Sequence, residues 1–290
     1  MNQNKPLVII AGPTASGKTS LAIDLAEKFG GEIICADSRS IYKGADIGTA
    51  KATSKDRARV PHWGLDLVNP GDYFSVADFK KYADKKIIEI HKRGNIPFLV
   101  GGTGLYIDAV IFNYQFGKEV NVVERTTLNQ MSLDQLYELC KTNHIKLPEN
   151  FKNKRYVIRE IEKNGMDTSK DNKPKDNTII VGITTEKSIL RSKIESRVEQ
   201  LLEDGVVNEA KTLGEKYGWE NEALKSNAYR IIKLYYAGLI DYTDIKIKNS
   251  ILDWKLAKRQ MTWFRRNLFI KWLNIEQAKE YISEQLAKHA

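Results

Sequence analysis

GPTASGKT is the stretch that decides the fold, and it comprises Gly12, Pro13, Thr14, Ala15, Ser16, Gly17, Lys18 and Thr19. It fits the pattern G-x-x-x-x-G-K-[ST], in which glycines let a loop curl so that its backbone amides point at a phosphate. The apolar run 7–12 precedes the loop, and the helical pattern 19–31 follows it. We therefore predict that these eight residues bind phosphate, with Lys18 as a point charge and the Thr19 hydroxyl as a ligand of Mg²⁺.

Working outward, apolar runs at 32–37, 98–102 and 178–184 predict three further buried strands. Between the first two of these runs, apolar residues recur every three or four positions from Val76 to Ile90, which predicts an amphipathic helix that begins near Ser75. Strands that alternate with helices are typical of a parallel sheet covered on both faces. The predicted fold class is α/β, with a P-loop parallel sheet flanked by helices.

Residues 114–177 interrupt the alternation of strands and helices. SLDQLYELC (132–140) and NKRYVIREIE (153–162) read as helices with no strand between them. We predict a small inserted helical subdomain at 114–177, within a catalytic core made of 1–113 and 178–290. The core ends in helices, the longest of which spans about 245–266, with an apolar stripe of Ile251, Trp254, Met261 and Phe264.

The composition excludes several classes of protein. The chain has 290 residues, 42% hydrophobic and 29% charged, and no apolar run approaches the ~20 residues that a membrane-spanning helix needs. Two cysteines and scattered histidines, without a CxxC pair, argue against a disulfide scaffold and a zinc module. A net charge of +9 favours a polyanionic partner. We expect a cytoplasmic monomer that does not bind membranes.

Asp37 is the candidate catalytic carboxylate. It ends the predicted strand 32–37, whereas the runs 98–102 and 178–184 end in glycines and threonines. Ligands of open parallel sheets bind at the carboxyl ends of the strands, so we expect Asp37 beside the phosphate loop, as a metal-holding acid or a general base. Gly101-Gly102-Thr103-Gly104 adds a second glycine turn at this edge, and the Thr103 hydroxyl either caps a helix or faces the pocket.

Basic residues gather in two segments. Lys258 and Arg259 belong to a basic run between Lys246 and Lys271 in which Asp253 is the only acid, and Arg155 and Arg159 lie on the predicted helix of the insertion. Two basic surfaces and one phosphate loop indicate a substrate that carries many phosphates.

Taken together, these motifs resemble those of the bacterial tRNA dimethylallyltransferases. GPTASGKTSLA, ADSRSIYKGADIGTAK, PHWGLDLVNPGDYFSVADF, FLVGGTGLY and AKRQMTWFRR stand in that family's order, from Gly12 to Trp272. The resemblance implies Mg²⁺-dependent transfer of a dimethylallyl group from dimethylallyl diphosphate to the exocyclic amine of the adenosine 3′ of the anticodon in tRNA. It also implies that the phosphate loop binds the diphosphate of the donor and that no nucleotide is hydrolysed.

The resemblance also implies roles for individual residues. Asp37 would be the general base, Thr103 and Lys18 would assist the reaction, and Thr14 to Thr19 would hold the diphosphate. The residues that would contact the tRNA anticodon stem-loop are Asp37, Ser38, Arg39, Ser40, Thr103, Arg125, Arg155, Arg159, Lys258 and Arg259. The chain departs from the family at Ser40, Ala52, Trp63 and Ala228, where Gln, Pro, His and Gly are usual.

Three other functions use the same loop. An adenylate isopentenyltransferase would prenylate a free nucleotide, and a P-loop kinase would use the loop for nucleotide binding, with ATP as the ligand. An RNA-binding protein with a vestigial loop would catalyse no transfer. The two basic segments argue against a free nucleotide, which needs no such surface.

Overall fold

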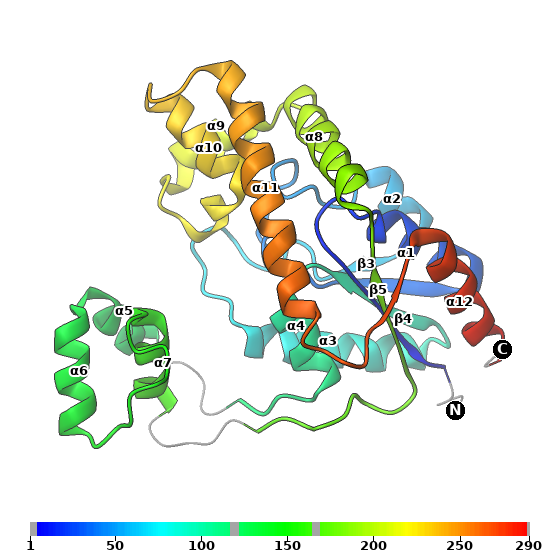
Figure 1. Cartoon of the computed structure of the whole chain (residues 1–290), viewed down its shortest axis with the longest axis horizontal. Helices are drawn as coiled ribbons and strands as arrows, with labels where there is room; N and C mark the ends of the chain where they lie inside the picture. The colour runs from blue at the N-terminus through cyan, green and yellow to red at the C-terminus, as the bar shows by residue number, and fades with distance from the viewer. Residues whose placement is uncertain (1–4, 117–121, 164–168, 289–290) are drawn as a thin grey trace. The chain divides into compact units, whose positions relative to one another are not determined.

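The computed structural model describes residues 5–116, 122–163 and 169–288. The chain forms two compact units (Figure 1): one comprises Met1–Ile111 and Pro174–Ala290, and the other comprises Phe112–Lys173. The sequence had placed the insertion at 114–177. Both boundaries of the smaller unit therefore lie a few residues before the predicted ones.

The larger unit is built on a six-stranded parallel sheet in the order β3-β2-β4-β1-β5-β6. β1 lies between β4 and β5, and β4 is inserted between β1 and β2, so the chain returns to the centre of the sheet after forming β2 and β3. The predicted strands are confirmed, whereas β3 and β6 are too short to form an apolar run and were not predicted. The strands are β1 (Leu7–Ala11), β2 (Gly31–Cys35), β3 (His62–Trp63), β4 (Ile96–Gly101), β5 (Thr178–Ile183) and β6 (Lys271–Leu273).

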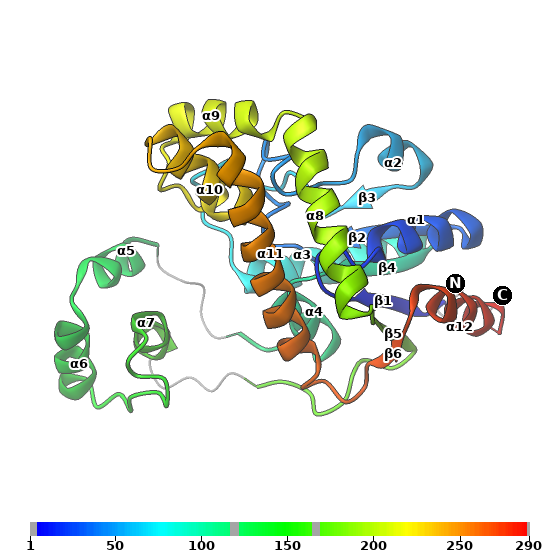
Figure 2. The same cartoon turned by 45° about the horizontal axis from the view of Figure 1, so that its top comes forward.

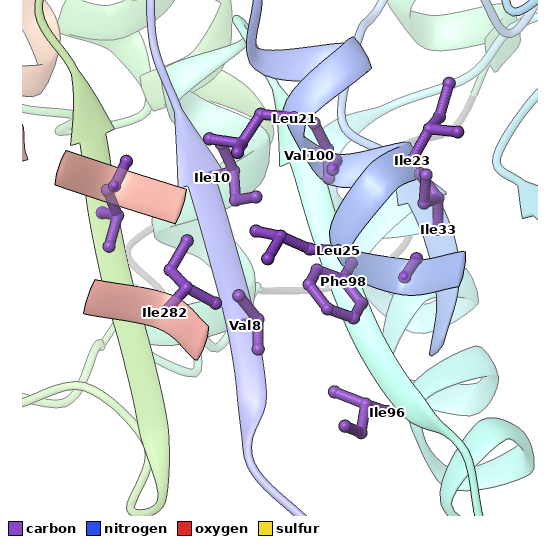
Figure 3. Close-up of a cluster of buried hydrophobic side chains, with 14 of the residues drawn as sticks. Val8, Ile10, Leu21, Ile23, Leu25, Ile33, Ile96, Phe98, Val100 and Ile282 are labelled. Atoms are coloured by element: carbon purple, nitrogen blue, oxygen red, sulfur yellow. The ribbon is translucent and has the colours of Figure 1, made fainter. Parts of the chain in front are cut away.

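Helices cover both faces of this sheet. α1 (Lys18–Phe29) and α12 (Ile275–Ala287) pack on one face, where Val8 and Phe98 meet Leu25 and Ile282 (Figure 3). α3 (Val76–Lys92) and α4 (Gly104–Ile111) pack on the other. The α3 helix begins at Ser75, which forms a capping box with Asp78, as an N-cap serine followed by an acid favours.

A group of helices adjoins the sheet in the same unit. α11 packs against α8 and α10, as both views of the chain show (Figures 1 and 2). The α8 helix buries one apolar face, which consists of Leu190, Ile194, Val198 and Leu201. The remaining elements are α2 (Ser54–Arg59), α8 (Lys187–Glu203), α9 (Val206–Tyr217), η1 (Glu222–Lys225), α10 (Asn227–Tyr236) and α11 (Tyr242–Phe264).

The apolar stripe predicted for α11 is wrong at one end. Ile251 is 47% exposed, whereas Asn249 and Asp253 are buried. The α11 helix packs against two other helices, and Asp253 is accommodated because Asn227 of α10 donates a hydrogen bond to its Oδ1 at 2.7 Å. The periodicity of apolar residues cannot predict this face, because a buried carboxylate is tolerated when it has a hydrogen-bond partner.

The smaller unit is a helical cluster with its own core. It contains α5 (Val122–Gln130), α6 (Leu133–Thr142) and α7 (Lys154–Lys163), of which the sequence predicted the last two. α6 begins at Ser132, whose capping box with Gln135 explains the sharp start. The buried residues of this core are Leu128, Leu136, Cys140, Val157, Ile158 and Ile161. No helix in the described part of either unit is long and apolar enough to cross a membrane.

Candidate active site

The phosphate loop follows β1 and leads into α1. Ala15 and Gly17 have positive φ angles of 60° and 87°, and Gly17 caps α1 without a side-chain hydrogen bond. Backbone of this kind forms a nest of N–H groups at a helix N-terminus, which is an anion site. The Ser16 hydroxyl is fully buried and has no hydrogen-bond partner among the described residues. The loop therefore lies between β1 and α1, where the sequence predicts it, and two of its N–H groups donate within the protein: that of Thr14 to Gln260 Oε1 and that of Ser16 to the Pro13 carbonyl.

Two cations stand at this loop. The Lys18 ammonium donates to the Pro13 carbonyl at 3.0 Å, and Arg197 of α8 donates from Nη1 to the Thr14 hydroxyl at 2.9 Å. Burial, and then the charge of Arg197, lower the pKa of Lys18 to about 8, against smaller opposing effects of Asp37 and Cys35. The Arg197 Nε is buried without a partner in the described ranges. An anion bound here would relieve the repulsion between the two cations.

Asp37 lies just beyond the end of β2, in a tight turn. The Arg39 backbone N–H donates to Asp37 Oδ1 at 2.8 Å, which fixes the carboxylate. Burial, and then the Asp37 charge, raise the pKa of the nearby Cys35 to about 12. The thiol therefore stays protonated, and Asp37 supplies the anionic side chain at the end of this strand.

Thr103 lies across from Asp37, at the end of β4. Its hydroxyl accepts a hydrogen bond from the Ser38 N–H at 3.0 Å, and its own N–H donates to the Ala36 carbonyl at 3.1 Å. A Cβ on Gly101 would lie 2.1 Å from the Ala36 oxygen, so only glycine permits this approach. The glycine turn therefore brings Thr103 to the Asp37 turn, which favours a place in the site over a simple helix cap.

These three segments line one cavity of about 460 Å³. Thr14, Lys18, Thr19, Asp37, Ser38, Arg39, Ser40, Thr103 and Arg259 all contribute to its wall. A second cavity of about 720 Å³ shares Lys18, Thr19 and Arg197 with the first. Both cavities therefore reach the phosphate loop.

The oxygens around the loop suit a magnesium ion. The exposed Thr19 hydroxyl and the Asp37 carboxylate lie on the wall of the same cavity. Among the residues described, no group of three or more His, Cys, Asp or Glu residues forms a metal cage. Mg²⁺ is usually held by one or two protein oxygens together with substrate phosphates and water, and this donor set fits that pattern.

A basic groove of about 510 Å³ runs along α11, and Arg259 lines both this groove and the cavity. Its Trp263 indole is fixed by donating to Asp108 Oδ2 at 2.7 Å, and the Arg266 guanidinium lies 5.8 Å from the Trp263 ring centroid. The groove is lined by Lys255, Lys258, Arg259, Thr262, Trp263 and Arg266.

The remaining arginines predicted to contact tRNA belong to the helical unit. Arg155 and Arg159 are exposed on α7. Arg125 of α5 is different, because its Nη1 donates to Glu162 Oε2 at 2.9 Å and both side chains are largely buried. The structure thus gives Arg125 an internal partner, whereas the two arginines of α7 point to solvent.

Sequence patterns did not single out three of the residues at the site. Arg197 and Gln260 lie on helices far from the phosphate loop in sequence. His62 of β3 lines the cavity with a neutral ring, since burial lowers its pKa, and its Nδ1 lies 2.9 Å from the Val60 carbonyl. Only the motifs that contain Gln260 and His62, AKRQMTWFRR and PHWGLD, could have drawn attention to them.

The departures from the family pattern fall at the same place. Ser40, Ala52 and Ala228 line the cavity. Trp63 instead follows His62, and its indole donates to the buried Glu32 at 2.6 Å. Three of the departures therefore contribute to the wall of the cavity, whereas Trp63 forms its hydrogen bond with Glu32 of β2.

A parallel sheet whose central strand enters a GxxxxGKT loop, with Asp37 and a second glycine turn at the same edge, defines a protein of the P-loop α/β class. The family model described as IPP transferase matches residues 40–267. The chain belongs to this IPP transferase family.

Curated relatives and solved structures agree with this assignment. The tRNA dimethylallyltransferase of Lactococcus lactis subsp. cremoris is 39% identical over 285 residues, which cover 95% of this chain and 94% of that protein. That of Bacillus subtilis is 35% identical and covers 94% and 92%. The full-length tRNA isopentenylpyrophosphate transferase from Bacillus halodurans superposes with a TM-score of 0.75 at 34% identity, covering 99% and 98% of the two chains.

Proposed function

We propose that this protein transfers a dimethylallyl group from dimethylallyl diphosphate to the exocyclic N6 amine of the adenosine 3′ of the anticodon in tRNA. One observation carries the proposal. In a chain of the IPP transferase family, the phosphate loop, Asp37 and Thr103 line the same cavity of about 460 Å³, and Arg259 of the basic groove lines it too. A site for a diphosphate, a base and a route to a polyanion therefore adjoin one another.

The phosphate loop would hold the diphosphate leaving group. An allylic diphosphate loses its leaving group early, and negative charge accumulates on the departing oxygens. The loop amides, Lys18 and Arg197 are held in place before any ligand arrives, so they stabilise that charge without reorganising. The Thr19 hydroxyl would hold Mg²⁺, and the Asp37 carboxylate on the same cavity wall is then left for the role of base. That ion, when bound, supplies further positive charge to the diphosphate.

Asp37 would accept the proton of the adenine amine. The lone pair of this amine is delocalised into the ring, so the amine is a weak nucleophile and needs a carboxylate close by as the new bond forms. The hydrogen bond from the Arg39 N–H keeps Asp37 oriented, and the Ser38 N–H ties Thr103 to the same turn. Thr103 then has its hydroxyl at the reacting end of the cavity. The adenine must leave its stack in the anticodon loop to enter this cavity.

The basic groove on α11 supports an RNA substrate over a free nucleotide. A free nucleotide would occupy the cavity alone and would leave Lys255, Lys258 and Arg266 without a ligand. Phosphates of an RNA backbone would lie against them and position the substrate.

A labelling experiment tests the function. The protein is incubated with labelled dimethylallyl diphosphate and Mg²⁺, together with tRNA, AMP or ATP in separate reactions. We expect label in tRNA alone, and nuclease digestion should place it on one adenosine beside the anticodon. Label in AMP or ATP would establish an adenylate isopentenyltransferase. A kinase would instead consume ATP and leave the allylic donor intact.

A further inference from the structure

Gln260 of α11 bridges the two loops of the site. Its Oε1 accepts a hydrogen bond from the Thr14 N–H at 2.8 Å, and its Nε2 donates to the Gly102 carbonyl at 3.1 Å. An amide pairs with one donor and one acceptor in this way in a single orientation. One side chain thus joins the phosphate loop after β1 to the glycine turn after β4.

Gly102 leaves the space that this bridge occupies. A Cβ on Gly102 would lie 2.3 Å from Gln260 Nε2, whereas its backbone is not in the left-handed region that favours glycine. The glycine is therefore required by the approach of the Gln260 amide and not by the conformation of the turn. Thr103 directly follows Gly102, so the bridge to the Gly102 carbonyl also holds the backbone next to Thr103.

Thr14 is held at two of its polar groups. Its N–H donates to Gln260 Oε1, and its hydroxyl accepts a hydrogen bond from Arg197 at 2.9 Å. These contacts fix where the loop lies relative to the rest of the site. The Thr14 N–H is therefore engaged within the protein, whereas the family resemblance implies that Thr14 to Thr19 together hold the diphosphate.

We propose that Gln260 is a positioning residue for the transfer, which holds the phosphate loop and the Gly102–Thr103 turn in register. This inference rests on the proposed function. The leaving diphosphate lies on one of these loops, and the attacking amine meets Thr103 on the other. Errors of about 1 Å in such an arrangement cost as much as 10²-fold in rate, because the reacting atoms no longer align.

Two substitutions break the bridge in different ways. Gln260→Glu keeps the acceptor for the Thr14 N–H and places a carboxylate oxygen against the Gly102 carbonyl. Gly102→Ala leaves the Gln260 side chain in the protein, but the added Cβ displaces its amide from the Gly102 carbonyl. We expect each to lower kcat by about 10- to 100-fold while the KM for dimethylallyl diphosphate changes less than about threefold and tRNA affinity is unchanged.

A double-mutant cycle makes the test specific. If Gly102→Ala acts by expelling the Gln260 amide, Gly102→Ala and Gln260→Ala together should be no worse than either alone. Hydrogen exchange of the segments 12–19 and 100–104 should be faster in every bridge variant, whatever the activity. Ile251→Ala, an exposed residue of the same helix, is the control and should change neither exchange nor kcat.

Two results would overturn the inference. The first is a kcat within twofold of the unmutated protein in Gln260→Glu and Gln260→Ala. The second is a double mutant whose loss is the full sum of the single losses. The unmutated protein is assayed in parallel, so the absence of transfer to tRNA there would refute the proposed function separately.

Discussion

The phosphate loop and the basic groove on α11 both carry positive charge, but the cations at the loop are half-buried and those of the groove are exposed to solvent. Lys18 and Arg197 are half-buried and line the cavities, and burial together with the charge of Arg197 lowers the pKa of Lys18. Lys255, Lys258, Arg259 and Arg266 of the groove are exposed.

Under the proposed function, this difference assigns the loop to the reaction and the groove to tRNA binding. A desolvated cation is costly to keep, and a closely fitting anion offsets that cost with strong, oriented contacts. A solvated cation gains little from any single contact, and its effect comes from the number of phosphates it helps to neutralise. Substitutions at the loop should therefore change the reaction, and substitutions in the groove should change tRNA binding.

The largest effect should come from Asp37→Asn. We expect single-turnover transfer to fall by ~10² to 10⁴-fold, because the amide cannot accept the proton of the amine. The Kd for tRNA, measured by filter binding, should change less than about twofold, since the phosphate contacts remain. Transfer at the normal rate would remove Asp37 from the role of base.

A pH titration should sharpen the comparison at Lys18. Its pKa of about 8 lies below the ordinary 10.5, so the ammonium is charged below pH 8 and loses its proton as the pH rises further. Binding of inorganic pyrophosphate, measured by calorimetry, should therefore weaken above pH 8 by up to about tenfold per pH unit. Lys18→Met corrects for ionisation of the ligand itself. A profile in the unmutated protein that matches that of Lys18→Met would contradict this prediction.

Substitutions in the basic groove and on α7 should change the salt dependence of tRNA binding. Ala replacement of Arg155, Arg159, Lys258 or Arg259 should weaken tRNA binding a few-fold and reduce the slope of log Kobs against log salt by about one unit each. The KM for the allylic donor should not change. An unaltered salt slope in the quadruple variant would show that these faces do not contact tRNA and would favour a free nucleotide.

The smallest effect on tRNA is expected at Arg125. Arg125→Met removes the ion-pair partner of Glu162. Burial raises the pKa of Glu162, and the charge of Arg125 opposes that shift. We expect a loss of about 1 to 3 kcal/mol in the stability of the helical unit, by thermal or urea unfolding, because a largely buried carboxylate is left without its cation. Glu162→Gln in the same chain should restore part of it. A loss of tRNA affinity with unchanged stability would make Arg125 an RNA contact.

Local sequence patterns predicted the centre of the site. The GxxxxGKT loop, the apolar strands around it and Asp37 depend on residues close together in the chain, and a parallel sheet brings strand ends to one edge whatever lies beyond. The capping serines of α3 and α6 are local in the same sense.

The remaining features depend on contacts between distant segments. Arg197 lies 183 residues from Thr14, and Gln260 lies 246 residues from it, so no periodicity or spacing links them. Arg125 meets Glu162 only after α5 and α7 pack, and Ile251 is exposed because the neighbours of α11 bury Asn249 and Asp253 instead. Sequence by itself determined the loop, the four apolar strands β1, β2, β4 and β5, and the position of Asp37 at the end of β2. The tertiary structure alone decided which distant side chains complete the site, because helix packing decides which faces of α8 and α11 meet it.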